Sequence, residues 1–368
     1  MTDTSTIMNG TNNAIVPILD GATSDFQTII PEIEAERRIA SDRNASIDER
    51  LEAYENIIDS EIGDTTLTRA RNIEREIGLR QIFLKFDGNN PTGTQKDRIA
   101  FTQAMDALRR GYDAITAATC GNYGVALALA ASFAGIKCRI YLPADYQGKR
   151  NQEMDELGAD LVRVPGDYEH AVAVSRRCAE EDEIYDANPG GLNTAMQLKA
   201  YGEIAYEIYD ELGDAPAVLT VPVSNGTTLA GIYKGFVSLY RRGKTSRMPR
   251  FAAGSSFRKN PIVQSFIDNR PSCENLNPVK IRETSVNEPL INWHSIDGDL
   301  ALDAIRATHG WASHASDKMM LSCSRLLRER EGLSVLPAST SSLIALTEQH
   351  RRESLPNDRY VVILTGRK

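Results

Sequence analysis

Lys96 is the residue whose position best suits covalent chemistry. It ends a turn-rich stretch that begins at Asp87 and stands just before the helical pattern of residues 99–108. A cation at a helix start lies near the positive end of the helix dipole, which disfavours the charged amine. Because a neutral amine is what attacks an aldehyde, this position favours a lysine that forms a Schiff base. Taken alone, one lysine is more often a surface group.

A loop of small and polar residues, 119–124, follows the expected strand Ala114–Ala118. Its two glycines let backbone N–H groups converge on an anion such as a substrate carboxylate. The amide of Asn122 can donate a hydrogen bond to an oxygen of a bound ring. An ordinary turn is an equally good interpretation of this loop alone. The candidate substrate-binding residues are Thr119, Cys120, Gly121 and Tyr123.

A third loop, 224–228, has the form of a phosphate-binding site. It lies between the expected strand Ala217–Val221 and another helix. Small residues allow close approach, successive N–H groups point at the ligand, and the helix dipole favours a dianion. Capping of an ordinary helix by glycine and threonine is the competing interpretation. The candidate residues are Ser224, Asn225, Gly226, Thr227 and Thr228.

Two other phosphate-binding motifs are disfavoured. Gly88 and Gly93 have the spacing of a nucleotide-binding P-loop, but two residues separate the second glycine from Lys96, which argues against ATP. The sequence also has no GxGxxG motif, which weakens the alternative of a dinucleotide site.

Composition and charge exclude several classes of partner. The chain has 42 Lys and Arg against 50 Asp and Glu, a net charge of −8, and no dense basic cluster, so we expect no nucleic acid partner. Its longest apolar runs, such as 125–131, are too short to cross a bilayer, and the N-terminus has no apolar run. We therefore expect no membrane partner and a cytoplasmic location. Without CxxC or HExxH spacing among five cysteines and five histidines, we expect no metal.

Short apolar runs alternate with helical patterns beyond residue 80. This alternation predicts an α/β fold with parallel sheets covered by helices on both faces. Binding sites in such sheets lie beyond the carboxyl ends of the strands, where the three loops are placed. Residues 1–45 suggest a mobile or partner-draped arm, and residues 48–58 a short amphipathic helix. The expected strands are Gln81–Phe86, Ala114–Ala118, Lys137–Leu142, Asp160–Val164, Ala217–Val221, Phe251–Ala253 and Tyr360–Leu364.

Together the three loops resemble those of the tryptophan synthase β-like, or fold-type II, pyridoxal-phosphate enzymes, and most closely the threonine synthases. The match follows the family's motif order from Gly63 to the end of the chain. The resemblance implies two three-layer α/β/α domains with mostly parallel sheets and pyridoxal 5'-phosphate in the cleft between them. The larger, cofactor-binding domain would comprise residues 46–97 and 208–368, and the smaller, substrate-closing domain residues 98–207.

The resemblance also implies residue roles. Lys96 would be the Schiff-base lysine and the catalytic base, and Asn122 would bond the ring hydroxyl of the cofactor. Residues 224–228 would hold its phosphate. Thr365, in a Thr-Gly pair after the last strand, would meet its pyridine nitrogen. A neutral hydroxyl there restrains the ring as an electron sink, which suits elimination and replacement.

One departure concerns the substrate. Threonine synthases use an arginine to hold the substrate phosphate, and Thr194 stands near that place here. A threonine hydroxyl cannot replace an arginine fork, which weakens the case for phosphohomoserine. Arg258 and Lys259 are a candidate basic patch, although a solvated pair is the stronger interpretation. We expect residues 286–294 to form a wall of the cleft.

The predicted function is a carbon–oxygen lyase or β- or γ-replacement enzyme that acts on a small amino acid, with or without a phosphate on the leaving oxygen. Within this class the alternatives are threonine synthase itself, a cysteate synthase-like enzyme that joins phosphoserine to sulfite, and a serine or threonine dehydratase. A catalytically silent paralogue that serves as a binding partner is the alternative from another class. The relatives are commonly dimers, which implies a homodimer.

Overall fold

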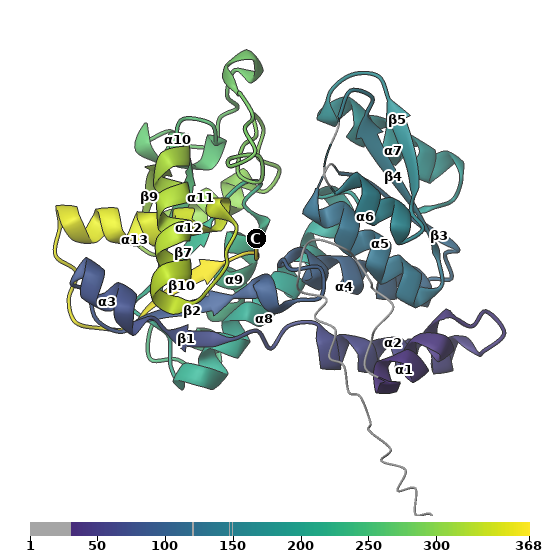
Figure 1. Ribbon diagram of the computed structural model, residues 1–368, viewed down its shortest axis with the longest axis horizontal. Coiled ribbons are helices and arrows are strands. Elements are labelled where there is room, and N and C mark those ends of the chain that lie inside the picture. Colours follow the sequence, from purple (N-terminus) through teal and green to yellow (C-terminus); the bar gives the residue numbers. More distant parts are fainter. Residues whose placement is uncertain (1–30, 120, 147, 149) are drawn as a thin grey trace, which may run out of the picture.

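The protein contains two parallel or mostly parallel β-sheets, each covered by helices (Figure 1). The computed structural model describes residues 31–368 except residues 120, 147 and 149. One sheet has the strand order β1-β2-β10-β7-β8-β9, and only β1 among these strands is antiparallel to its neighbour. The other sheet has the order β5-β4-β3-β6 and is parallel throughout. We call the halves built on the six-stranded and four-stranded sheets the large and small domains.

The strands of the large domain are β1 (Leu67–Arg69), β2 (Ile82–Phe86), β7 (Val218–Pro222), β8 (Arg250–Ser256), β9 (Trp311–Ala315) and β10 (Tyr360–Leu364). Those of the small domain are β3 (Ala114–Ala118), β4 (Lys137–Pro143), β5 (Asp160–Val164) and β6 (Tyr185–Asp186). All seven expected strands are present. The three others gave weak patterns, since β1 and β6 are very short and β9 lacks β-branched residues.

Helices cover both faces of each sheet, which confirms the α/β class. In the large domain, α13 packs on one face and α9 and α11 on the other, and in the small domain α7 lies opposite α4 and α5. The helices are α1 (Pro31–Ser41), α2 (Ile47–Glu61), α3 (Arg71–Ile77), α4 (Lys96–Arg109), α5 (Asn122–Ala134), α6 (Asn151–Glu156), α7 (Tyr168–Glu181), α8 (Thr194–Leu212), α9 (Thr227–Arg241), α10 (Pro261–Ile267), α11 (Gly298–Ala307), α12 (Asp317–Glu331) and α13 (Ser341–Arg352). The 3-10 turns are η1 (Asp87–Asn89), η2 (Gly191–Asn193), η3 (Pro278–Lys280) and η4 (Pro337–Thr340).

The N-terminal segment differs in part from the expected arm. Residues 31–41 form α1, and α1 packs against α2 and α5 through the buried side chains of Ile33 and Ala40. The expected amphipathic helix is α2, which begins with a capping box between Ser46 and Glu49. The rest of the expected arm, residues 1–30, lies outside the described residues.

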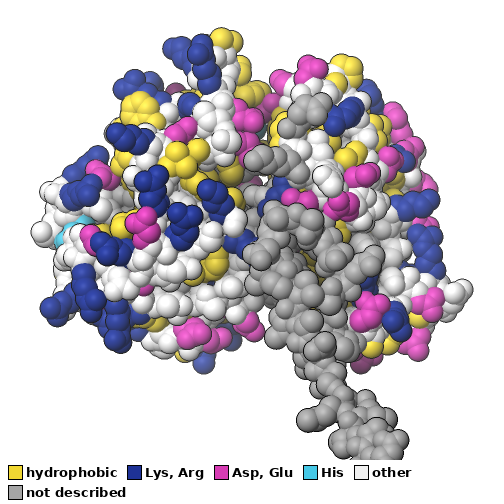
Figure 2. Space-filling model, in the orientation of Figure 1, with side chains coloured by type: hydrophobic (Ala, Val, Ile, Leu, Met, Phe, Trp, Pro, Cys, Tyr) yellow, Lys and Arg dark blue, Asp and Glu magenta, His cyan; other side chains and the backbone are white. Residues whose placement is uncertain are grey.

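The strands of the two sheets fall within the segments expected for the two domains, whose exact limits stay a prediction. Helices α4 and α8 lie at the junction and contact each other (Figure 1). Acidic and basic side chains both occur on each domain over the face shown in Figure 2. Over the described part of the chain, no helix has both the length and the apolar composition that crossing a membrane requires.

A buried network of charged side chains links α4, α8 and β2 at this junction. The Arg98 guanidinium on α4 bonds both carboxylate oxygens of Asp87 at 2.9 Å and those of Glu207 on α8 at 2.5 and 2.9 Å. The amine of Lys85 on β2 lies 2.5 Å from Glu207. Arg98, Asp87 and Lys85 are almost fully buried, so each charge depends on its partners for stabilisation. Burial opposes ionisation of Glu207, but Arg98 and Lys85 outweigh it and lower its pKa to about 2.

We expect Arg98→Met to destabilise the fold strongly. It leaves the buried carboxylates of Asp87 and Glu207 without their main partner, a loss that typically costs about 3–5 kcal/mol. Urea unfolding followed by circular dichroism measures the change. The exposed Arg109, on the same helix, supplies the control, because Arg109→Met should change the free energy of unfolding by less than about 0.5 kcal/mol. Equal effects of the two changes would contradict a special role for the network.

Candidate functional site

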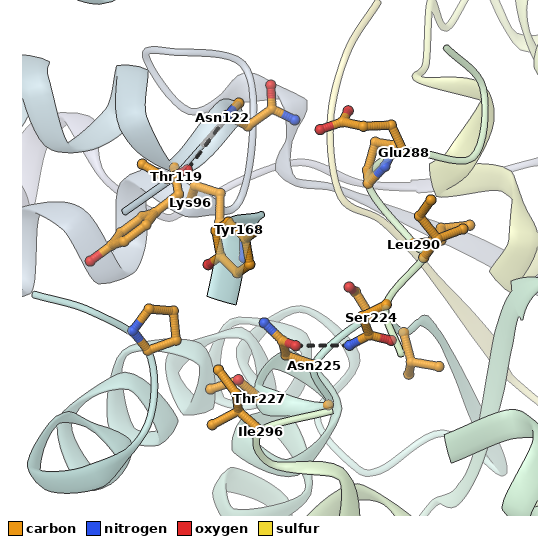
Figure 3. Close-up of a pocket in the computed structure, with 18 of the residues that line it drawn as sticks. Lys96, Thr119, Asn122, Tyr168, Ser224, Asn225, Thr227, Glu288, Leu290 and Ile296 are labelled. Carbon is orange, nitrogen blue, oxygen red and sulfur yellow. Dashed lines mark hydrogen bonds between the residues drawn. The ribbon is translucent and has the colours of Figure 1, made fainter. Parts of the chain in front are cut away.

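A cleft of about 890 Å³ lies between the two domains. It is bounded by the start of α4, the loop after β3, helix α7, the loop after β7 and residues 281–296 (Figure 3). The segment after β10 also lines it. The loops after β3 and β7, the segment after β10 and the stretch that leads from β2 to α4 all follow the carboxyl ends of parallel strands, as expected for a ligand site in this class of fold.

Lys96 is the first residue of α4 and lines the cleft. The loop before it is bound to the segment after β10, since the Gln95 N–H donates to the Thr365 carbonyl at 3.0 Å and the Arg367 N–H to the Gly93 carbonyl at 2.9 Å. The lysine therefore starts from a fixed backbone position.

The surroundings of the Lys96 amine make its neutral form easier to reach than in water. Its Nζ lies 3.4 Å from the hydroxyl of Tyr201 on α8, and 5.9 Å from the centre of that ring. Desolvation in the cleft lowers the pKa of Lys96 to about 8. The environment can thus supply the uncharged amine that attack on an aldehyde requires.

The loop after β3 brings Thr119, Gly121 and Asn122 to the cleft. Helix α5 begins at Asn122, so the first N–H groups of the helix have no acceptor within it and are available to an anion. Cys120 lies outside the described residues. Tyr123 also borders the cleft, but its buried hydroxyl lies 2.5 Å from Gln103 Oε1 and 2.7 Å from the Ala187 carbonyl. That hydroxyl therefore bonds protein groups inside the small domain.

Oxygen atoms of the loop after β7 accept hydrogen bonds from other residues of the large domain. The Asn260 amide donates to the Ser224 carbonyl at 2.9 Å, and the Ser295 hydroxyl donates to the same carbonyl at 3.0 Å. The Asn292 amide donates to Asn225 Oδ1 at 2.8 Å. These bonds hold the loop in place, and the N–H groups at the start of α9, which have no acceptor within the helix, are available to a ligand in the cleft.

Gly226 and Thr227 complete this cradle. Gly226 has a φ of +92°, and a methyl group added there would lie 2.8 Å from the Asp297 carbonyl and 2.9 Å from Ala301 Cβ, so only glycine fits. The Thr227 hydroxyl lies 2.5 Å from Asp297 Oδ2 and donates to it. Because its hydroxyl is bonded to Asp297, the group that Thr227 can offer an anion is its backbone N–H. Thr228 also lines the cleft.

A pair of hydroxyl groups lies at another edge of the cleft. Ser339 Oγ and Thr365 Oγ1 are 3.0 Å apart, and both residues line the cleft. They are neutral groups that can donate to or accept from a ring nitrogen.

Pyridoxal phosphate fits this set of donors. Lys96 provides the amine for its aldehyde, the start of α9 provides N–H groups and a favourable dipole for its phosphate, and the hydroxyls of Ser339 and Thr365 suit its ring nitrogen. The cleft brings together every described residue that the sequence analysis proposed for the three loops and for the ring nitrogen.

The expected wall is confirmed, because Glu288, Leu290, Trp293 and His294 all line the cleft. Two further expectations concerned Thr194 and the pair Arg258 and Lys259, and none of these residues lines the cleft. The Thr194 hydroxyl lies 3.5 Å from Asp297 Oδ1, and the Lys259 amine bonds the Arg282 carbonyl at 2.6 Å.

Tyr201 and Arg176 are among the cleft residues that the sequence analysis did not anticipate. Tyr201 occupies an apolar position of α8 that has the spacing of an ordinary core residue. Arg176 lies on α7, where an arginine is typical of a solvated face, and its guanidinium donates to the Pro189 carbonyl at 2.7 Å. Neither carries a local sequence signal, because both reach the cleft only through packing of distant segments.

Comparison with known proteins agrees with this geometry. The family model described as "Pyridoxal-phosphate dependent enzyme" matches residues 58–366. A threonine synthase from Methanocaldococcus jannaschii is 31% identical over 306 residues, which are 82% of this chain and 74% of that protein. One from Synechocystis sp. is 30% identical over 312 residues, 83% of this chain and 76% of that protein.

Solved structures show the same fold. The processed form of threonine deaminase isoform 2 from Solanum lycopersicum has a TM-score of 0.70 at 15% identity and covers 87% of this chain and 90% of its own. A pyridoxal 5'-phosphate-dependent aspartate racemase has a TM-score of 0.71 at 18% identity and covers 86% of this chain and 94% of its own. The resemblance inferred from the three loops is thereby confirmed. Pyridoxal phosphate is the cofactor, and the chain belongs to the pyridoxal-phosphate-dependent enzymes of fold type II, in which it is similar to the threonine synthases.

Proposed function

We propose that the protein is a carbon–oxygen lyase or β- or γ-replacement enzyme that acts on a small amino acid. The observation that supports this proposal most is that three groups share one cleft. They are the Lys96 amine, whose pKa is about 8, the start of α9, which suits an anion, and the neutral hydroxyls of Ser339 and Thr365. The similarity to threonine synthases, one of which is 31% identical to this chain, also supports this class of reaction.

The proposed roles are those that the resemblance to the family implies, and the placement of these residues in one cleft supports them. Lys96 holds the cofactor covalently and, once released by the substrate, accepts the α-proton. Residues 224–228 bind the phosphate, Asn122 bonds the ring hydroxyl, and Thr365 meets the ring nitrogen. The loop containing Thr119, Cys120, Gly121 and Tyr123 holds the substrate carboxylate.

Bound pyridoxal phosphate supplies an electron sink that weakens the bonds to the α-carbon of an amino acid. The neutral hydroxyls of Ser339 and Thr365 limit protonation at the ring nitrogen, which favours elimination and replacement. Lys96, at a fixed helix start and beside Tyr201, is placed to receive the proton in that cleft.

The test is a substrate panel. Purified protein loaded with pyridoxal phosphate is mixed with L-serine, L-threonine, L-homoserine and their O-phospho forms, with and without sulfite, and ketoacid, phosphate and new amino acids are measured. Threonine from O-phosphohomoserine identifies a threonine synthase, and cysteate from O-phosphoserine identifies a cysteate synthase. No product and no change in cofactor absorbance with any member would instead support the silent paralogue. The homodimer and the cytoplasmic location stay predictions.

We expect borohydride reduction of the loaded protein to fix the cofactor to Lys96, as read by peptide mass spectrometry. Lys96→Ala should abolish the adduct and lower turnover by at least about 10²-fold, the usual contribution of a general base. Lys199→Ala, an exposed lysine on α8, is the control and should keep both. An adduct on another lysine would refute the assignment.

The pKa of Lys96 predicts a pH dependence of cofactor attachment. With a pKa of about 8 rather than 10.5, about one amine in ten is neutral at pH 7. The rate of attachment to the cofactor-free protein, followed by absorbance, should rise about tenfold per pH unit up to pH 8 and then level off. A rate that keeps rising to pH 10 would show an unshifted lysine.

We expect Gly226→Ala to weaken binding of pyridoxal phosphate by at least about tenfold, because the left-handed backbone and the contacts with Asp297 and Ala301 must both give way. Gly243→Ala is the matched control, since Gly243 has a φ of +65° but open space around an added methyl group. Fluorescence titration measures binding, and thermal unfolding measures stability. Equal losses of affinity in both variants would contradict the cradle.

A further inference from the structure

Glu288 faces the proposed reaction site from the wall opposite α5. Its carboxylate points across the cleft toward Asn122 (Figure 3). A methyl group added at Gly121, the residue before α5, would lie 3.4 Å from Glu288 Oε1. The carboxyl group therefore reaches the helix start at which we place the substrate carboxylate.

The backbone around Glu288 is held firmly. Its N–H donates to the Thr284 carbonyl at 3.0 Å, and the fully buried Asn287 accepts the Thr284 N–H at 2.9 Å. The Thr284 hydroxyl donates to Asp317 at 2.7 Å, which links the segment to α12. On the other side, the buried Leu290 accepts through its carbonyl from Asn260, at 3.3 Å. The position of Glu288 in the cleft is therefore fixed by structure on both sides.

The half-buried Glu288 carboxyl differs from the buried carboxyls of Asp87, Asp97 and Asp297 in its lack of partners. Asp87 is paired with Arg98, Asp97 accepts from Thr92, and Asp297 accepts from Thr227. No side chain in the described part of the chain forms an ion pair or hydrogen bond with the Glu288 carboxyl. A group that no protein partner uses is available to a bound molecule.

The electrostatic surroundings favour a carboxyl group that carries a proton. Burial and the nearby Glu283 raise the pKa of Glu288 to about 7, although Arg150 offsets part of this rise. Near neutral pH the group can therefore both hold and release a proton, as a general acid must. Among the described residues that line the cleft, there are four carboxylates, on Asp167, Glu169, Glu283 and Glu288, against the cations Lys96 and Arg176.

We propose that Glu288 is the general acid that protonates the leaving oxygen of a β-hydroxy amino acid, and that unphosphorylated hydroxy amino acids are a substrate class of this cleft. This inference rests on the proposed function. Hydroxide is a poor leaving group and needs a proton as it departs, whereas phosphate departs as a stable anion and does not. Glu288 would thus matter for the first kind of substrate only.

The step balances as follows. The Lys96 amine accepts the α-proton, and the electron pair of that C–H bond forms the C=C bond between the α- and β-carbons. The pair of the β-carbon–oxygen bond leaves with the oxygen, which takes the Glu288 proton and departs as water. Lys96 ends as an ammonium and Glu288 as a carboxylate, and solvent restores both.

The experiment compares two leaving groups in Glu288→Gln, in protein loaded with cofactor. Elimination from L-serine or L-threonine should fall by about 10²-fold or more, the scale of general-acid catalysis, while elimination of chloride from β-chloro-L-alanine should fall by less than about tenfold. Cofactor absorbance should be unchanged. Glu329→Gln, which removes an exposed carboxylate on α12 outside the cleft, should keep both rates within about tenfold of the unaltered protein.

The outcomes separate the two proposals. Equal losses with both substrates would mean that Glu288 only supports the structure, and no loss with the hydroxy amino acids would also overturn the inference. If the unaltered protein eliminates chloride or phosphate but never water, Glu288 is not the acid, and the proposed function stands. If it transforms no amino acid at all, the proposed function itself fails.

Discussion

The buried network of Arg98, Asp87, Glu207 and Lys85 is the constraint on which the site depends. Arg98 lies two residues after Lys96 on α4, so its bonds to Asp87 and Glu207 fix the start of that helix against β2 and α8. Helix α8 also carries Tyr201, whose hydroxyl meets the Lys96 amine. Hydrophobic residues can stabilise a fold as well as buried ions can. We infer that the network matters because its charges are satisfied in one arrangement only, which sets the position of Lys96.

In the loop 224–228, the groups proposed to bind phosphate are likewise distinct from the residues that hold them in position, a division between binding and positioning. We propose that the loop binds through the backbone N–H groups at the start of α9, which have no acceptor within the helix, while other residues bond its carbonyl and hydroxyl groups. Asn260 and Ser295 donate to the Ser224 carbonyl, and the Thr227 hydroxyl donates to Asp297. None of these three is part of the loop motif. The conformation of the loop therefore depends on side chains that lie more than 30 residues later in the chain.

This division explains how far the sequence could predict the site. Periodicity located seven strands, and the loops at strand ends identified Lys96, the 119–123 loop and the 224–228 loop, because each signal is local. Tyr201, Arg176 and Asp297 gave no such signal, since their roles arise from contacts between distant segments. The Tyr123 hydroxyl illustrates the same limit: its position in the loop suggested substrate binding, but Gln103 and Ala187, which the local pattern does not include, take up its hydrogen bonds.

Desolvation by the same cleft acts in opposite directions on two groups. It lowers the pKa of Lys96 to about 8, and together with Glu283 it raises the pKa of Glu288 to about 7. A base and an acid are thus brought close in proton affinity, which lets both exchange protons near neutral pH. Glu207 is also largely buried, yet Arg98 and Lys85 hold its pKa near 2 and keep it charged. For these two carboxyls, the presence or absence of a paired cation, more than burial itself, therefore separates a structural group from one that is available for chemistry.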